Sequence, residues 1–464
     1  MESKIQIFIL LIKNLKILSK FQFNDKGFSV FSKIKFININ DQNNISSKLK
    51  SAILIPLNPI KSKNQETISW QTNIDNVDLI LWDKILKPKK WHSYPSNENP
   101  LFYFDTKRNL ILPSWDIISS FQLFINSDNS NKNKDKLGRI ISNKVEYHNL
   151  RLDNQPHLNN ANFIFLKATL LINNFSEPVE KFISPIKLII SHDIDLLRSN
   201  DFLSQSIRSY RLLLAFIKFN FKDIKKYFSG FIRAIFFPYR NYGNSIFGMI
   251  DIERQFDYKS SFYFLFGKRG RYGPRSSERE TLNFARSIPE GWSIGLHYNF
   301  DSFKNDKSLK NQLLVLRRNL KKKVISGRAH YFIFDFHKDA KLLNDCGIKI
   351  DESLSWHDSL GFRFGIAGPL IHQSQNIKTL FIPTIFMDQL FWHSDNKDEF
   401  NLEYEHLKKV GGIISFLVHN DIFFNKEYPQ FIGKYQKLLR KLYEDNLICC
   451  LPEDIYNISK PFLS

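Results

Sequence analysis

The sequence predicts an α/β protein in which a largely parallel sheet is covered by helices. Apolar residues make up 43% of the 464-residue chain, which is enough for a large core. In the second half, continuous apolar segments of strand length alternate with segments of helical periodicity, a pattern typical of sheets with both faces covered. Polar residues that can carry chemistry follow those apolar segments, and in such folds the chemistry sits at the carboxyl ends of the strands.

The expected elements of the second half follow from this alternation. The predicted strands are residues 185–190, 260–266, 292–296, 331–334 and 413–418. The predicted helices between them are residues 244–256, 277–286, 307–322 and 338–346. The alternation allows either a barrel or a doubly wound sheet.

The first half is expected to form a smaller α/β domain. Residues 52–56 and 79–82 are apolar runs of strand length bounded by polar or turn residues. Residues 126–137 are polar and of low complexity, so we expect an exposed loop there. A polar stretch near residues 175–184 marks the predicted boundary between an amino-terminal domain, 1–178, and a second domain, 179–464.

The beginning of the chain is expected to be an amphipathic segment rather than a signal peptide. The apolar run at residues 5–12 is short, Glu2 precedes it, Lys13 closes it, and no small-residue cleavage site follows. No stretch reaches the roughly 18–20 apolar residues of a membrane span. The three Cys are too few for a disulfide framework or a Cys-based zinc site. We therefore expect a cytoplasmic protein, soluble or bound peripherally to a membrane.

The net charge of +20 is spread along the whole chain, and no zinc finger, RNA-recognition signature or helix-turn-helix is present. Nucleic acid is therefore not expected as a partner. Residues 204–240 carry eight Lys or Arg against one Asp, interleaved with apolar residues, within a predicted helical insertion at 201–240. Such a segment can contact an anionic membrane surface, or it can be a helical hairpin whose charged face is simply solvated.

Polar residues follow the predicted strands one after another. Asp193 and Asp195 come directly after residues 185–190, and two carboxylates on one face repel unless a cation lies beside them. His297 ends the strand 292–296, and His419 ends the strand 413–418. Each is a weak signal alone, but one catalytic edge of a parallel sheet would collect all of them.

Two further segments contribute polar side chains. Arg328 and His330 lie in the segment 327–331, and His357 and Asp358 precede the Gly-Phe-Arg-Phe-Gly segment that contains Arg363. Asn420 follows His419 directly. These side chains complete the set expected at the carboxyl edge of the sheet.

The order of these motifs resembles the polysaccharide deacetylases, metal-dependent carbohydrate esterases with a distorted (β/α) barrel. The motifs are Asp-x-Asp at 193–195, Gly-Leu-His at 295–297, Gly-Arg-x-His-Tyr at 327–331, Gly-Phe-Arg-x-Gly at 361–365 and Val-His-Asn at 418–420. The sequence is most similar to the bacterial branch written His-Asp-Val-Asp, often found among surface-glycan genes. Residues 134–140 also resemble an element of the amino-terminal domain of that branch. The resemblance covers roughly residues 75–455.

The resemblance implies a role for five of these residues. Asp193 would be the general base, Arg328 would orient or pair with its carboxylate, and His419 would be the general acid. Asp195 and His297 would be ligands of a divalent metal, with zinc expected.

The commoner family motif has a second His four residues after the first, where this chain has Asp301. Either Asp301 or His330 could complete a three-ligand set, and we favour His330. Arg363, Asp358 and Asn420 would bind the substrate, although Arg363 could instead pair with Asp358.

The sequence therefore predicts a hydrolase that removes an N-acetyl, or less readily an O-acetyl, group from a bacterial surface glycan or its precursor. The alternative is a catalytically inactive protein that keeps the barrel and binds glycans or acts as a scaffold in polysaccharide assembly. The missing second His motivates this alternative. The sequence leaves the sugar, the oligomeric state and the role of the amino-terminal domain open.

Overall fold

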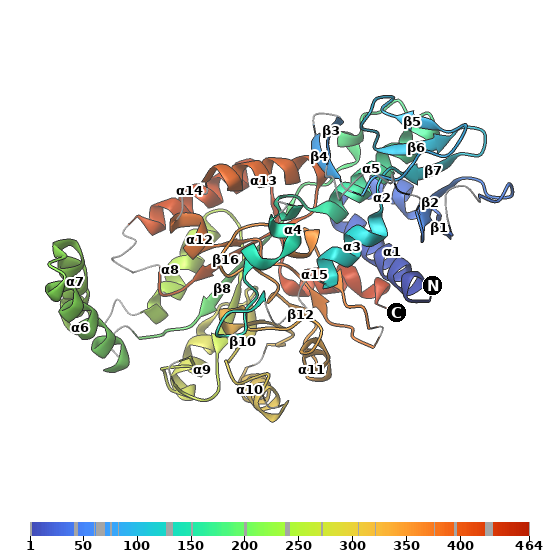
Figure 1. Ribbon diagram of the computed structural model, residues 1–464. Coiled ribbons are helices and arrows are strands. Elements are labelled where there is room, and N and C mark those ends of the chain that lie inside the picture. Colours follow the sequence, from blue (N-terminus) through green and yellow to red (C-terminus); the bar gives the residue numbers. More distant parts are fainter. Residues whose placement is uncertain are drawn as a thin grey trace.

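The structure is a computed structural model that describes residues 2–40, 45–59, 61, 70–74, 77–81, 83–126, 133–149, 152–198, 202–236, 242–270, 272–304, 306–320, 322–374, 376–393, 397–422 and 430–463. Within these residues it contains a ten-stranded sheet, a five-stranded sheet and a two-stranded sheet (Figure 1). The mixed α/β class expected from the sequence is confirmed.

The large sheet is built from the second half of the chain. Its order is β13-β14-β12-β11-β10-β9-β8-β16-β15, with β17 paired to β8, and every pairing is parallel except that of β13 with β14. The sheet curls, and its closure into a distorted barrel stays a prediction. The bounds of the strands are β8 Lys187–Ile194, β9 Ser261–Leu265, β10 Ser293–Tyr298, β11 Ser326–Ala329, β12 Ile350–Asp351, β13 Leu370–Ile371, β14 Leu380–Phe381, β15 Phe386–Met387, β16 Ile413–His419 and β17 Ile448–Cys449.

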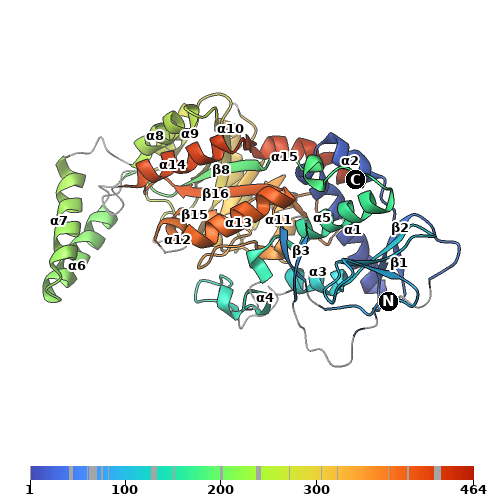
Figure 2. The same cartoon turned by 90° about the horizontal axis from the view of Figure 1, so that it is seen from above.

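Helices cover this sheet on its outer sides (Figures 1 and 2). Almost every residue of β8, β9, β10 and β16 is buried, which explains why these strands read as continuous apolar runs. The covering helices are α8 Tyr242–Arg254, α9 Glu278–Ser287, α10 Asp306–Asn319, α11 Ala340–Asp345, α12 Asp388–His393, α13 Lys397–Val410, α14 Phe431–Glu444 and α15 Pro452–Ser459.

One predicted strand is wrong. Residues 331–334 were expected to be a strand, but β11 ends at Ala329 and a 3-10 turn, His330–Phe332, follows. Tyr331 and Phe332 have φ values of 59° and 54°, in the left-handed region that bulky residues rarely adopt. The segment is apolar because Phe332 and Phe334 are buried in the core, not because it pairs within the sheet.

The amino-terminal part carries the five-stranded sheet, in the order β1-β2-β7-β6-β5, and the hairpin β3-β4. The expected strand at 52–56 is β2, and that at 79–82 falls on β4. The bounds are β1 Phe36–Ile39, β2 Ala52–Pro56, β3 Trp70–Ile74, β4 Val77–Leu81, β5 His92–Tyr94, β6 Phe102–Asp105 and β7 Leu110–Pro113, with helices α1 Glu2–Gln22, α2 Asp25–Ser32, α3 Ile117–Asn126, α4 Glu146–Asn149 and α5 His157–Ile172.

The amino-terminal part shares one hydrophobic core with the large sheet. Gln22 at the end of α1 donates to the carbonyl oxygens of Asn159 and Val410, and Asn159 donates to those of Ala367 and Gly411. The asparagines in the first half of α5 are therefore buried, and Asn159 hydrogen-bonds backbone of the second half. The domain boundary near residue 178 stays a prediction. Half of the expected loop at 126–137, residues 127–132, lies outside the described residues.

The predicted basic insertion is a hairpin of two helices, α6 Phe202–Ile217 and α7 Phe221–Phe236. It projects from one end of the molecule in both views (Figures 1 and 2). Among the described residues, no helix is both long and apolar enough to cross a membrane.

Candidate metal centre and active site

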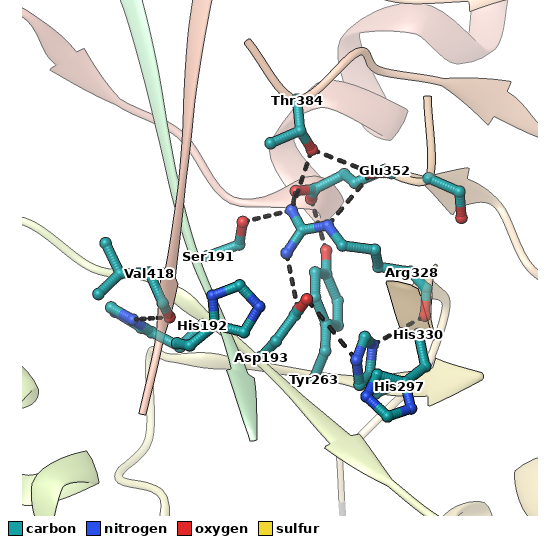
Figure 3. A network of polar contacts seen from close by, with 12 residues as sticks. Ser191, His192, Asp193, Tyr263, His297, Arg328, His330, Glu352, Thr384 and Val418 are labelled. Atoms are coloured by element: carbon teal, nitrogen blue, oxygen red, sulfur yellow. Dashed lines mark hydrogen bonds and ion pairs between the residues drawn. The ribbon is translucent and has the colours of Figure 1, made fainter. Parts of the chain in front are cut away.

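The carboxyl edge of the large sheet brings the predicted polar residues together. In the parallel register, Asp193 on β8 lies opposite His419 on β16, and His297 on β10 lies opposite Arg328 on β11. Because the strands are parallel, their ends meet at one edge of the sheet. Figure 3 shows Asp193, Arg328, His297 and His330 converging there.

Asp195, His297 and His330 form a cluster with the donor atoms of a metal site. One donor atom from each residue lies within 4.8 Å of the other two. The Nε2 atom of His297 is 3.0 Å from Asp195 Oδ1, and that of His330 is 3.6 Å from Asp195 Oδ2. Both rings are buried. One carboxylate and two imidazoles are ligands that zinc commonly takes, with a position left open for catalysis.

The hydrogen bonds of both rings orient their lone pairs toward Asp195. Nδ1 of His297 lies 3.0 Å from the carbonyl oxygen of Arg328, and Nδ1 of His330 lies 3.1 Å from that of Tyr272. Since a carbonyl oxygen only accepts, each Nδ1 donates, and a neutral ring then presents a lone pair at Nε2. Such outer hydrogen bonds are usual for histidines that bind metals.

Two buried atoms of the cluster lack a hydrogen-bond partner. They are His297 Nε2 and Asp195 Oδ1, which face each other at 3.0 Å without hydrogen-bond geometry. Because buried polar atoms are nearly always satisfied, this pair fits a metal ion between them.

Arg328 holds the base candidate in a buried network (Figure 3). Its guanidinium donates to Asp193 Oδ1 at 2.8 Å, to Ser191 Oγ at 2.6 Å and to Glu352 Oε2 at 2.6 Å. A weaker bond reaches Thr384 Oγ1 at 3.2 Å. Burial opposes the charge on Arg328, but Asp193 and Glu352 outweigh burial and raise its pKa. One oxygen of Asp193 is therefore fixed, while Oδ2 lies 3.7 Å from His297 Nε2, on the side of the metal cluster.

His419 is positioned by Asp388 at the start of α12. Asp388 Oδ1 accepts from His419 Nδ1 at 2.9 Å, and Asp388 Oδ2 accepts from the backbone N–H of His419 at 2.6 Å. Burial lowers the pKa of His419, but Asp388, and then Asp195 and Asp193, outweigh burial and raise that pKa to about 10. The imidazole is therefore cationic at neutral pH, with Nε2 as the nitrogen that Asp388 does not engage.

The three predicted substrate-binding residues contact the protein itself. Arg363 is buried, donates to the carbonyl oxygen of Ser355 at 2.7 Å and lies over the ring of Trp356. Asp358 accepts from the backbone N–H of Ser142 at 3.2 Å. Their role in binding substrate stays a prediction.

Asn420, the third of them, braces the end of β16. Its side-chain amide donates to the carbonyl oxygens of Leu196 at 2.7 Å and Tyr242 at 2.9 Å. Its own backbone N–H donates to the carbonyl oxygen of Asp193 at 3.2 Å. These bonds tie the loop that carries Asp195 to the end of the neighbouring strand.

Sequence reasoning did not assign Glu352 or Asp388, which position Arg328 and His419. Glu352 also accepts a hydrogen bond from Tyr263 Oη. Burial, and after it the negative charge of Glu352, raises the pKa of Tyr263 well above its usual value. Asp388 ends the segment 383–388, to which the sequence alone gave no role. The feature that could have indicated a role for Glu352 is its position directly after β12, at the same edge of the sheet as the other strand ends.

Aromatic rings line one side of the metal cluster. Tyr331 stacks on His330 with ring centroids 4.0 Å apart, and it meets Tyr272 edge-on at 5.9 Å. Tyr272 in turn stacks on Phe300. Tyr331 is partly exposed, so this wall presents an aromatic surface next to the site.

The sequence matches no protein-family profile and no curated protein. Similar solved structures include a candidate polysaccharide deacetylase from Mycobacterium smegmatis, with 12% identity, a TM-score of 0.39, and coverage of 60% of this chain and 92% of that chain. A mutant of the peptidoglycan deacetylase PdaC from Bacillus subtilis has 10% identity, a TM-score of 0.30, and coverage of 60% and 93%. A mutant CE4-family pseudoenzyme with restored activity has 12% identity, a TM-score of 0.27, and coverage of 60% and 74%. At 10–12% identity and TM-scores of 0.27–0.39, these structures do not identify the function of this chain.

Proposed function

We propose that the protein is a metal-dependent hydrolase that removes an acetyl group, N-linked rather than O-linked, from a bacterial surface glycan or its precursor. The observation that carries the proposal is the cluster of Asp195, His297 and His330, whose donor atoms converge beside Asp193 and leave two buried atoms unsatisfied. A divalent metal such as zinc, when bound there, supplies a Lewis acid that polarises the acetyl carbonyl and lowers the pKa of water.

Asp193 acts as the general base. Arg328 and the strand β8 hold its carboxylate, and the bond to Oδ1 leaves Oδ2 facing the metal ligands. Oδ2 takes the proton of the attacking water. Because Arg328 is itself fixed by Glu352 and Ser191, the base cannot rotate away from this position without breaking buried bonds.

His419 acts as the general acid. Its Nδ1 donates to Asp388, so Nε2 is the atom that transfers a proton to the departing nitrogen. An amine is a poor leaving group unless it is protonated, and the raised pKa of His419 keeps the ring protonated at neutral pH. An acid and a base therefore lie on neighbouring strands.

The substrate class rests on the sequence resemblance to polysaccharide deacetylases. The aromatic wall formed by Tyr331, Tyr272 and Phe300 supports a sugar substrate, since aromatic faces pack against the apolar faces of sugar rings. The inactive alternative was motivated by Asp301, which stands in place of a second His. His330 supplies a third donor atom, which favours the enzyme.

Calorimetry with zinc and cobalt tests the metal centre without knowledge of the substrate. We expect one-to-one binding that is lost in Asp195→Ala and retained in Asp193→Asn, because Asp193 is the base and not a ligand. Acetate release from N-acetylated oligosaccharides is then expected for the wild type and not for Asp193→Asn. A wild-type protein that binds neither metal would contradict the proposal, and so would an Asp193→Asn variant with near-normal turnover.

A further inference from the structure

The α6–α7 hairpin exposes an unusual concentration of apolar side chains. Nine of the twenty-one large apolar side chains that are exposed among the described residues lie within its 35 residues. Soluble surfaces seldom expose contiguous apolar patches of this kind unless they bind a partner. The nine are Tyr210, Leu213, Phe216, Ile217, Phe219, Phe221, Phe228, Ile232 and Phe236.

These side chains follow helical spacing. Tyr210, Leu213 and Ile217 recur at intervals of three and four along α6 and therefore share a face. Phe221, Phe228 and Ile232 recur at intervals of seven and four along α7. Each helix thus keeps an apolar stripe facing solvent in addition to the face that it packs against the other helix.

The turn between the helices is built to present two phenylalanines. The backbone N–H of Asn220 bonds the carbonyl of Ala215, which closes α6 with Phe219 in the left-handed conformation (φ 51°) that glycine usually takes. The side chain of Asn220 then caps α7 through reciprocal bonds with Asp223. Phe219 and Phe221 are 79% and 77% exposed, more than any other large apolar side chain of the described residues.

The charge of the hairpin identifies the chemistry of its partner. Residues 202–236 contain seven Lys or Arg and one Asp, and Lys218 and Lys222 flank the two phenylalanines of the turn. Lys218, Lys222 and Lys225 are exposed. Long basic side chains beside inserted aromatic rings can reach lipid phosphates while the rings enter the acyl boundary.

We propose that the α6–α7 hairpin docks the protein on the surface of an anionic lipid bilayer. Each helix has 16 residues, about 24 Å, which is shorter than the roughly 30 Å hydrocarbon core, so the hairpin lies in the interface and does not span it. The hairpin projects away from the body, which leaves its turn free to reach a flat surface (Figures 1 and 2). A bilayer fits better than an acidic protein groove, because apolar side chains surround the turn on both helices. The inference does not depend on the chemistry proposed for the active site.

Flotation of the full chain with vesicles tests the proposal. We expect binding to phosphatidylcholine vesicles that contain phosphatidylglycerol, and much weaker binding to phosphatidylcholine alone. Phe219→Ser with Phe221→Ser should lower the partition coefficient about 100-fold, from the loss of two inserted rings. Lys222→Gln with Lys225→Gln should lower it roughly 30-fold on anionic vesicles.

Matched controls distinguish binding through the hairpin from nonspecific association with lipid. Leu402→Ser removes an equally exposed apolar side chain elsewhere, and Lys87→Gln with Lys89→Gln removes two exposed charges elsewhere; both should float like the wild type. A wild-type protein that does not bind anionic vesicles would overturn the proposal, as would binding that ignores lipid charge. The wild type could instead form a dimer, fail to bind vesicles, and lose the dimer in Phe219→Ser with Phe221→Ser. That result would overturn the proposal and make a second copy of the chain the partner of the hairpin.

Discussion

Removing Arg328 should destabilise the fold in a way that acid partly reverses. Arg328 is fully buried and bonds two carboxylates, Asp193 at 2.8 Å and Glu352 at 2.6 Å. In Arg328→Met these carboxylates lose their cation but stay buried. Breaking a buried pair in this way typically costs 3–5 kcal/mol, so we expect the free energy of unfolding to fall by about 4 kcal/mol near neutral pH.

The pH dependence follows from Glu352. Burial raises its pKa above the usual value, and Arg328 opposes that rise. Without Arg328 the pKa of Glu352 in the folded state rises further above its value in the unfolded state, so the folded variant binds the additional proton. Stability of the variant relative to the wild type should therefore increase as the pH falls from about 7.5 to about 5.5.

Urea unfolding followed by tryptophan fluorescence at both pH values measures this effect. Arg317→Met is a matched control. Arg317 donates to the carbonyl oxygens of Val324 and Cys346, so its loss leaves no buried carboxylate without its cation. The loss in free energy of unfolding caused by Arg317→Met should not depend on pH in this range. The double variant Arg328→Met with Glu352→Gln should recover about half of the loss. A single Arg328→Met variant within about 1 kcal/mol of the wild type near neutral pH would refute the proposed charge network.

The remaining predictions concern side chains of the site. His419→Ala should lower acetate release from N-acetylated oligosaccharides by about 10²–10⁴-fold. It should leave hydrolysis of p-nitrophenyl acetate nearly unchanged, because the phenolate leaves without a proton. Equal losses of activity on both substrates would exclude the acid role. Asp388→Asn removes the carboxylate that raises the pKa of His419 to about 10. Because the acid must be protonated, the alkaline limb of kcat/KM should move down by about 2 pH units. Asp445→Asn should leave it in place, because Asp445 pairs with Tyr404 and Lys408 instead. His330→Ala should weaken zinc binding at least about tenfold in calorimetry and Asp301→Asn should not; the reverse would make Asp301 the third ligand.

The strand ends were predictable because burial on both faces leaves a strong signal. The strands β8, β9, β10 and β16 lie where continuous apolar runs place them, and a parallel sheet gathers their ends at one edge. That rule alone brings Asp195 and His297 together. His330 lies beside them although residues 331–334 were wrongly predicted to be a strand, because β11 ends one residue before His330.

The partners of the site residues were less predictable, because they follow two very short strands. Glu352 reaches Arg328 only because β12 pairs with β11, and Asp388 reaches His419 only because β15 pairs with β16. Both pairings join strands that are consecutive in the chain, but β12 and β15 are two residues long, too short to give a clear signal in the sequence. A lone Asp or Glu after such a segment is as often a helix cap or a solvated side chain. The burial of Asn159 was unpredictable for another reason, since its partners, Ala367 and Gly411, lie more than 200 residues away.

The three histidines of the site show why residue type alone could not assign their roles. His297, His330 and His419 all lie at or just beyond strand ends, and all three engage a partner through Nδ1. For His297 and His330 that partner is a backbone carbonyl, which accepts a hydrogen bond from Nδ1 and adds no full negative charge, so Nε2 can serve as a metal ligand. For His419 the partner is the carboxylate of Asp388, which stabilises a second proton on the ring and makes Nε2 a donor. An exchange of these two surroundings would place a cation among the ligands and leave the departing amine without its acid, so the single carboxylate of Asp388 separates the catalytic imidazole from the two that hold the metal.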